Sequence, residues 1–485
     1  MKIRRFLSVF LLSVLLTALF LVPQAAALDS PVLDAKCALL MDETAGRMLY
    51  GHNEKEKAYP ASITKVMTAL LTLEAVDRGD LSLSQPITAS HLAVTSIDED
   101  SSTAGIEAGE VLTVEQLLNC LLIVSANEAA NVLAEAVSGS IADFVALMNQ
   151  RAGELGCEGT HFANTNGLHD PQHYTTAWDI YLIAREAMKH DLFMTICGSK
   201  SYDVPATNMS DVRELHSTNA LISNWRTLGY IYDYADGLKT GYTDEAGRCL
   251  LASAIKDGRR LISVVLGCTT KEVNGETRLM NFVDSATLLD WGYNNFTVQT
   301  VFTKDDLIQE IPVLLSKETN AVLVHTAEDV NILLPNDVTT DMLERKVTVY
   351  GDTAFAPIEA GQELGEMTLS YDGYDYATVK LLAADSVSVN RQSLIHISEP
   401  TRQIPPLSVL LQAPGEDSHR GGDPAGAGRG GLGAYAAPQE PLRFPRQTQS
   451  RHPQLSRQTQ ITGPQGRRRS VCLFSVRERI SHAPQ

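Results

Sequence analysis

Three short groups of polar residues, far apart in the chain, could together carry out acyl transfer on a serine. They are Ser62-Ile63-Thr64-Lys65, Ser125-Ala126-Asn127 and Lys239-Thr240-Gly241. In this order they supply a hydroxyl nucleophile with a lysine base, a proton-relay pair, and a cation for a substrate carboxylate. Each group alone is weak, because short Ser/Lys patterns arise by chance. Their order and their local settings together indicate a serine acyl-transfer enzyme.

Ser62 and Lys65 would form the nucleophile and its base. A helical repeat continues through Val66 and Leu70, so Ser62 opens a helix on which residues three apart share a face. A lysine takes a proton only when its pKa is lowered by burial or by another cation, which Lys239 could provide. The helix start also favours an oxyanion developing at Ser62. Taken alone, the pair is better explained as an N-capping serine followed by an exposed lysine.

A second Ser-x-x-Lys sequence, Ser253-Ala254-Ile255-Lys256, lies in a predicted strand. Residues three apart on a strand point to opposite faces of the sheet. This second copy therefore cannot form the same dyad.

Ser125-Ala126-Asn127 lies at the break between two apolar helical runs, residues 117–124 and 129–137. Polar groups at such a break can point into a cleft, where Ser125 could relay protons and Asn127 could hold Lys65 or a substrate amide. The alternative is simple capping of the second helix.

Lys239-Thr240-Gly241 precedes a hairpin predicted over residues 249–268 and is expected on an edge strand. There Lys239 and Thr240 can bind a carboxylate by charge and hydroxyl, and Gly241 lets a substrate backbone approach closely. The alternative is a surface turn.

The elements that must position these groups follow a simple order: strands open the domain, helices fill its middle and strands close it. This order predicts an α+β fold, a mostly antiparallel sheet with helices packed against it. The strand signals are a hairpin over 39–53 and a hairpin turn at Asp257-Gly258. The helix signals are a C-terminus at Gly79, a capping box at Thr113 and Gln116, and N-caps at Ser140 and Thr176, with Asp143 and Asp179 at the third helical position.

Composition divides the chain further. Residues 1–27 have a basic start, an apolar run from Phe6 to Val22 and the small residues Ala25-Ala26-Ala27, which predict a signal peptide; a retained membrane anchor is the alternative. We place the catalytic domain at 28–297. Short alternating apolar runs predict a small β-rich domain at 298–390.

Residues 391–485 lose all periodic pattern. They contain 13 Arg, no Lys and 6 Asp plus Glu, which gives this segment a net charge of +7. The whole chain has a net charge of −18, so residues 1–390 carry −25. The string from Ser393 to Arg402 resembles the translation of a sequencing adapter. We interpret this segment as a frameshift or chimaeric artefact, with a disordered basic tail as the alternative.

The acidic main body argues against nucleic-acid binding. The seven cysteines lack metal-binding or disulfide spacing and are expected to be buried small hydrophobes. His161, His169 and His173 lack a carboxylate that would complete a helical zinc motif. We therefore expect no cofactor and no metal.

The three groups together resemble the penicillin-binding serine enzymes, and more closely the low-molecular-weight D-alanyl-D-alanine carboxypeptidases. The resemblance covers roughly residues 35–390 and includes Pro60-Ala61-Ser62-Ile63-Thr64-Lys65, Asn164-Thr165-Asn166-Gly167-Leu168, Gly237-Leu238-Lys239-Thr240-Gly241-Tyr242-Thr243 and Ala246-Gly247. It implies a β-lactamase/transpeptidase-like catalytic domain followed by a small β-rich domain.

The same resemblance implies site roles. Ser62 would be the acylated nucleophile, Lys65 the base, and Ser125 and Asn127 the second motif. Lys239 and Thr240 would bind the terminal carboxylate on the strand that carries Gly241, and the backbone N–H groups of Ser62 and Tyr242 would form the oxyanion hole. Some relatives have His where Tyr242 stands.

The implied reaction is removal of the terminal D-Ala from peptidoglycan pentapeptides, outside the cytoplasm at the membrane or cell wall, with β-lactam antibiotics as inhibitors. Relatives commonly end in a membrane anchor, which is not visible here, although we expect the native protein to contact a membrane surface. A β-lactamase, a peptidoglycan endopeptidase and an inactive peptidoglycan-binding protein are the alternatives. Against a β-lactamase, no Glu-x-x-x-Asn-type element for fast deacylation stands out in the middle of the chain.

Overall fold

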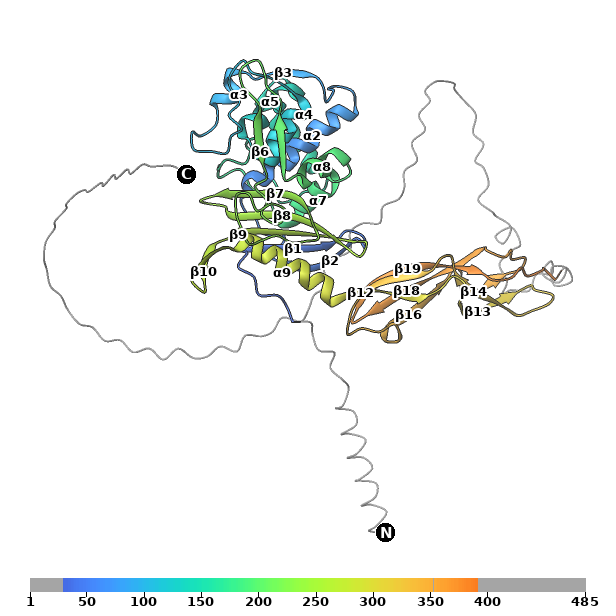
Figure 1. Ribbon diagram of the computed structural model, residues 1–485. Coiled ribbons are helices and arrows are strands. Elements are labelled where there is room, and N and C mark those ends of the chain that lie inside the picture. Colours follow the sequence, from blue (N-terminus) through green and yellow to red (C-terminus); the bar gives the residue numbers. More distant parts are fainter. Residues whose placement is uncertain (1–28, 352, 391–485) are drawn as a thin grey trace, which may run out of the picture. The chain divides into compact units, whose positions relative to one another are not determined.

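The computed structural model describes residues 29–351 and 353–390 (Figure 1). The predicted signal peptide, residues 1–27, and the segment 391–485 lie outside the described residues. The interpretations of both segments therefore stay predictions.

A five-stranded antiparallel sheet organises the catalytic domain, with the strand order β2-β1-β9-β8-β7. Its strands are β1 (Cys37–Asp42), β2 (Arg47–His52), β7 (Ala235–Thr243), β8 (Gly247–Lys256) and β9 (Arg259–Cys268). The two predicted hairpins, β1–β2 and β8–β9, are both present. Because β1 and β9 pair with each other, the first and last strands of this sheet in chain order meet in its interior. This leaves β7, which carries Lys239, as an edge strand, as predicted.

Helices cover both faces of this sheet (Figure 1). Along β1, Leu39 and Met41 pack into the core of the main helical layer, whereas Ala38 and Leu40 pack into a second core under one long helix, α9 (Met280–Asn295). This is the two-residue alternation of a strand buried on both sides. The helical layer contains η1 (Ala61–Thr64), α2 (Lys65–Asp77), α3 (His91–Thr95), α4 (Val114–Ile123), α5 (Asn127–Ser138), α6 (Ile141–Glu154), α7 (Ala177–Ala187) and α8 (Asp191–Gly198). Short strand pairs accompany it: β3 (Pro86–Thr88) with β4 (Val111–Thr113), and β5 (Ser201–Val204) with β6 (Arg213–His216). A further hairpin, β10 (Thr270–Val273) and β11 (Glu276–Leu279), leads into α9.

The helix N-caps predicted at Thr113, Ser140 and Thr176 are confirmed. Thr113 and Gln116 form the reciprocal capping box of α4. The hydroxyls of Ser140 and Thr176 accept the N–H groups at the third position of α6 and α7. Such caps contribute about 1 kcal/mol each, and they fix where each helix begins.

The β-rich part of the chain begins at β12 (Phe296–Phe302) and has a hydrophobic core of its own. β12 pairs with β15 (Val330–Pro335). The remaining strands form a six-stranded sheet in the order β16-β18-β19-β14-β13-β17. Their bounds are β13 (Leu307–Leu314), β14 (Ala321–Thr326), β16 (Glu344–Val349), β17 (Ala354–Phe355), β18 (Glu363–Tyr371) and β19 (Tyr374–Ala383), with a short η2 (Thr340–Met342). The predicted fold class, an α+β domain followed by a β-rich domain, is confirmed.

The six cysteines among the described residues are all free, and five are buried. Burial raises the pKa of the Cys120, Cys197 and Cys249 thiols to about 12, so these thiols pack as small hydrophobes. Cys472 lies outside the described residues.

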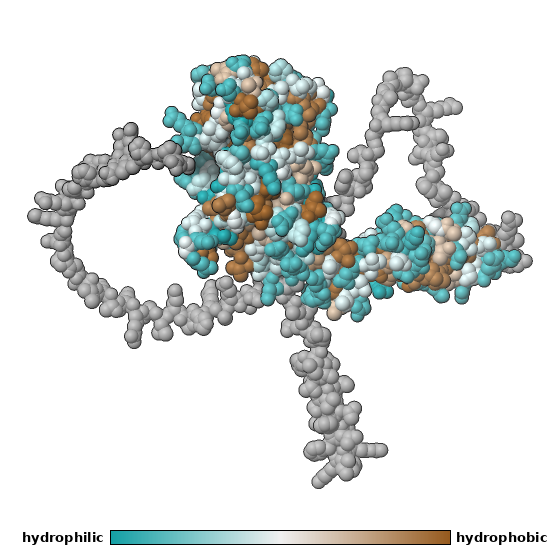
Figure 2. All heavy atoms as spheres, viewed as in Figure 1, coloured by the Kyte–Doolittle hydropathy of each residue, from teal (hydrophilic) through white to brown (hydrophobic). Residues whose placement is uncertain are grey.

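Across the described residues, no single helix is both long and apolar enough to cross a membrane; only the pair α5 and α6, bent by 84°, meets the length and composition together. On the face shown in Figure 2, apolar residues are scattered among hydrophilic ones.

Candidate active site

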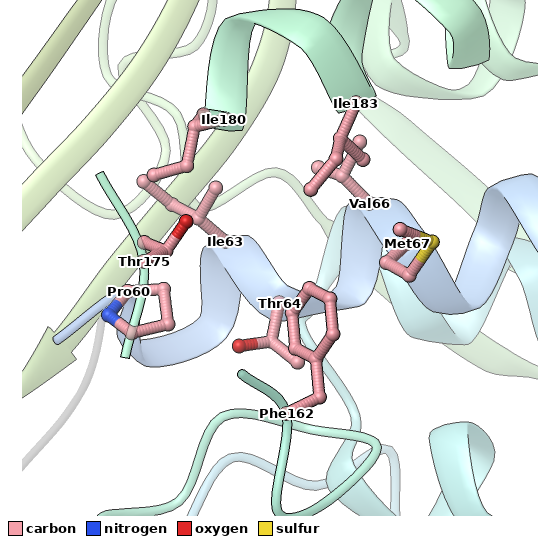
Figure 3. A pocket seen from close by; sticks show the side chains of 9 residues that line it. All are labelled: Pro60, Ile63, Thr64, Val66, Met67, Phe162, Thr175, Ile180 and Ile183. Atoms are coloured by element: carbon pink, nitrogen blue, oxygen red, sulfur yellow. The ribbon is translucent and has the colours of Figure 1, made fainter. Parts of the chain in front are cut away.

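Ser62 stands on a tightly constrained turn at the start of α2. Ala61, just before it, has a left-handed backbone with φ of 46°, which a non-glycine residue adopts only when its surroundings enforce it. Ser62 lies in the short 3-10 helix η1, one turn ahead of the α-helix that the sequence predicted to start there. The turn is anchored on its other side, where Ile63 and Val66 face apolar side chains from α7 and the loop before it (Figure 3).

Lys65 lies at the centre of the site and is completely buried. Its Nζ is 2.9 Å from Ser62 Oγ, 2.6 Å from Asn127 Oδ1 and 2.7 Å from the backbone oxygen of Asn166. Burial and then the charge of Lys239 lower the Lys65 pKa well below its usual value, while Glu128 acts in the opposite direction. Lys65 therefore has the geometry and the electrostatics of a neutral base.

The second group forms the turn between α4 and α5. Ser125 has φ of 67°, and Asn127 is the first residue of α5. Asn127 reaches Lys65 as predicted. The Ser125 hydroxyl is buried, yet it has no hydrogen-bond partner among the described residues. A buried hydroxyl is seldom left unpaired, so it is available to a ligand or a water molecule.

The third group lies on β7. Lys239 is buried, and its Nζ donates to the backbone oxygen of Thr240 at 3.0 Å. Burial, with a contribution from Arg226, lowers the pKa of Lys239 to about 7. The Thr240 hydroxyl is 2.7 Å from the hydroxyl of Thr218. Thr218 is also tied to the helix that precedes the second group, because its N–H donates to the backbone oxygen of Ile123 at the end of α4.

Gly241 is required by close packing. A Cβ at this position would lie 2.9 Å from the Pro60 oxygen and 3.1 Å from the Ser62 nitrogen. Gly241 therefore lets β7 pack directly against the turn that carries Ser62. The sequence suggests a different use for this glycine, the close approach of a substrate backbone. Tyr242 follows with a half-exposed side chain whose hydroxyl donates to Asp244 at 2.7 Å.

The loop over residues 160–176 closes the other side of the turn, and sequence reasoning missed its contribution. Gly167 has φ of 88°, and a Cβ there would lie 1.9 Å from the Ala61 oxygen. The ring nitrogen Nδ1 of His173 accepts the N–H of Ala163, so Nε2 carries the proton and donates to Thr64 Oγ1 at 2.7 Å. Burial lowers the pKa of His173 to about 4, which keeps this ring neutral.

The three histidines flagged in the sequence have separate contacts. His173 holds Thr64, His161 Nδ1 lies 2.6 Å from the Gln172 oxygen, and His169 lies 3.8 Å from Glu245. The second Ser-x-x-Lys sequence is in strand β8, where the Ser253 hydroxyl pairs with Arg260. The sequence signal for His173 is that it closely follows the family-like segment 164–168, and Thr218 has only a nearby strand. Their partners, Thr64 and Thr240, lie 109 and 22 residues away in the chain, so local patterns could not pair them.

Comparison with known proteins identifies the family to which these three groups point. The sequence profile of the D-alanyl-D-alanine carboxypeptidase family matches residues 24–270, and that of the penicillin-binding protein 5 C-terminal domain matches residues 296–389. D-alanyl-D-alanine carboxypeptidase DacF of Bacillus subtilis is 34% identical over 341 residues, which are 70% of this chain and 82% of DacF. DacA of Haemophilus influenzae is 29% identical, over 74% of this chain and 86% of DacA.

Solved structures agree in fold. Penicillin-binding protein 5 from Haemophilus influenzae superposes with a TM-score of 0.58 at 28% identity, covering 74% of this chain and 99% of that one. The carboxypeptidase DacD from Francisella tularensis gives a TM-score of 0.59 at 25% identity, over 76% and 97%. With two family profiles in chain order and relatives matched over most of their length, this chain belongs to the D-alanyl-D-alanine carboxypeptidase family of serine peptidases.

Proposed function

We propose that Ser62 attacks the carbonyl of the penultimate D-Ala in peptidoglycan stem peptides, releases the terminal D-Ala and forms an acyl-enzyme that water then hydrolyses. The observation that carries this proposal is the hydrogen-bond arrangement of Lys65. A neutral amine has two N–H donors, and two acceptors are in place for them, Asn127 Oδ1 and the Asn166 oxygen. The nitrogen lone pair is then left for the Ser62 hydroxyl at 2.9 Å.

The remaining roles follow from position. Proton transfer from Ser62 to Lys65 accompanies attack, and the backbone N–H groups of Ser62 and Tyr242 would bind the oxyanion. The unpartnered Ser125 hydroxyl would then pass its proton to the departing amine and take in exchange the proton that Lys65 received from Ser62, which returns Lys65 to its neutral form. Lys239 and Thr240 would bind the terminal carboxylate of the peptide, with Thr218 holding the Thr240 hydroxyl.

Penicillins would acylate the same serine, and the enzyme would act outside the cytoplasm, where its substrate lies. A signal peptide at residues 1–27 and a membrane contact of the native protein are part of this proposal.

The test is acylation by a fluorescent penicillin, with peptide mapping of the adduct, alongside release of D-Ala from diacetyl-Lys-D-Ala-D-Ala. We expect a long-lived adduct on Ser62 and D-Ala release. A rapidly hydrolysed adduct would indicate a β-lactamase, no adduct would indicate a binding protein, and an adduct on another residue would refute the assignment of Ser62.

A further inference from the structure

Glu128 is a buried carboxylate one residue beyond the second group, in the first turn of α5. Its side chain is 1% exposed. One oxygen, Oε1, accepts three hydrogen bonds: from Thr103 Oγ1 at 2.7 Å, from the N–H of Ala104 at 2.7 Å and from the N–H of Ile106 at 3.3 Å. All three donors belong to one loop segment, residues 103–106.

The loop that contains this segment is also attached to the active site through Asn127, the residue before Glu128. Asn127, which binds Lys65, donates its own N–H to the oxygen of Ser102 at 2.9 Å. Within the loop, Gly105 N–H donates to Thr103 Oγ1 at 2.7 Å. Glu128 therefore lies between the loop and the residue that holds the base.

The carboxylate is unusual for a purely structural anchor. No Lys, Arg or His side chain pairs with Glu128 anywhere in residues 29–390 that the structure describes, and its second oxygen, Oε2, is buried without a hydrogen-bond partner. Burial of an unpaired charge is costly. A neutral amide oxygen could accept the same three donors without that cost, so the negative charge calls for a reason beyond holding the loop.

We propose that Glu128 is a positioning residue for acyl transfer: its carboxylate fixes segment 103–106 against the Ser125-Ala126-Asn127 turn, next to the residue that holds Lys65, and places a buried negative charge there. This inference rests on the proposed role of Lys65 as the base. It assigns Glu128 no contact with substrate.

The charged and titratable groups around Lys65 come from three elements. Lys239 lies on β7, Glu128 on α5, and His173 on the loop before α7. Burial and Lys239 favour neutral Lys65, whereas Glu128 favours its ammonium form. Glu128 thus limits how far the base is weakened, because a lysine with too low a pKa would accept the serine proton poorly.

Two variants separate the charge from the anchor. Glu128→Gln keeps an oxygen for the three donors and removes only the charge. Glu128→Ala removes both. Glu135→Gln is the matched control, because Glu135 lies on the same helix and is partly exposed.

The experiment measures the rate of penicillin acylation of Ser62 from pH 5 to pH 9 in the full chain. For Glu128→Gln we expect the acid limb of the rate profile to move to lower pH, because the Lys65 ammonium loses an attractive charge. For Glu128→Ala we expect, in addition, a loss of about tenfold to a hundredfold in rate, as misplacement by about 1 Å can cause. Glu135→Gln should match the unmutated enzyme.

Hydrogen exchange provides the structural readout. In Glu128→Ala the amides of Ala104 and Ile106 should exchange about tenfold faster or more, since they lose a charged acceptor; in Glu128→Gln they should stay largely protected. An unchanged acid limb in Glu128→Gln, with the amides still protected, would overturn the electrostatic part of the proposal. Unchanged exchange and rate in Glu128→Ala would overturn the positioning part. Failure of the unmutated protein to acylate on Ser62 would instead refute the proposed function.

Discussion

The charge on Lys239 should make the enzyme's preference for a free C-terminal carboxylate depend on pH. Burial and Arg226 lower the Lys239 pKa to about 7. About nine-tenths of the free enzyme then carries the ammonium at pH 6, about a tenth at pH 8 and about a hundredth at pH 9. A hydrogen bond between charged partners contributes about 1.5–3 kcal/mol, or about tenfold to over a hundredfold in selectivity.

The assay compares kcat/KM for diacetyl-Lys-D-Ala-D-Ala and for its C-terminal amide from pH 6 to pH 9. Because kcat/KM reports the free enzyme, it follows the Lys239 pKa before substrate raises it. The ratio of acid to amide should be about tenfold to over a hundredfold at pH 6. It should fall by about tenfold per pH unit above pH 7 until it approaches one. Titration of Lys65 affects both substrates equally and cancels in the ratio.

Lys239→Gln provides the control, since it should give a small ratio that does not vary with pH. A ratio that stays constant from pH 6 to pH 9 in the unmutated enzyme would refute the reasoning. It would leave the Thr218–Thr240 hydroxyl pair as the carboxylate site.

Four further outcomes are expected. Ser62→Ala should abolish labelling by penicillin, whereas Ser253→Ala should keep it; mapping of the adduct checks both. Lys65→Arg should lose acylation although it keeps a positive charge, because guanidinium stays protonated; near-normal labelling would mean that another group takes the proton. Lys239→Met should raise the free energy of unfolding by about 1–4 kcal/mol at pH 6. The Lys239 pKa is about 7 in the folded protein and 10.5 in the unfolded chain, so keeping the buried ammonium lowers the free energy of unfolding by its full amount below pH 7. The stabilisation by Lys239→Met should therefore shrink as the pH rises from 7 toward 10.5, which urea titrations at several pH values would measure. A chain that ends at Asn390 should release D-Ala and melt like the full chain, because the described residues between 29 and 390 form three hydrophobic cores among themselves; a clear fall in melting temperature would contradict this.

Much of the fold could be predicted because its signals are local. The capping box at Thr113 and the hairpin turn at Asp257-Gly258 each involve residues within a few positions of one another. Hydrophobic periodicity then decides which elements are helices and which are strands. The three chemical groups could also be recognised locally, as a helix start, a helix break and an edge strand.

The contacts between the groups could not be predicted from local signals. The Lys65–Asn127 bond spans 62 residues, and the Lys65–Asn166 bond spans 101. The sequence marks Asn166 only as part of a family-like segment and His173 only as one of three histidines, and neither pattern indicates a contact with Lys65 or Thr64. Their roles arise only when the loop over 160–176 packs against η1, which is decided by the whole helical layer.

Ala61 illustrates why such contacts determine the site. Its strained backbone should cost about 1–3 kcal/mol, and no single neighbour compensates for it. The Ala61 oxygen accepts the Thr64 hydroxyl at 2.8 Å, and Thr64 is in turn held by His173. Gly167 and Gly241 both approach this turn so closely that a methyl group at either position would collide with its backbone. The turn that presents Ser62 is thus held by the loop, by β7 and by a buried neutral histidine together. A side chain added at Gly167 should therefore abolish acylation without removing any catalytic group, and Gly167→Ala with normal penicillin labelling of Ser62 would show that the turn can relax.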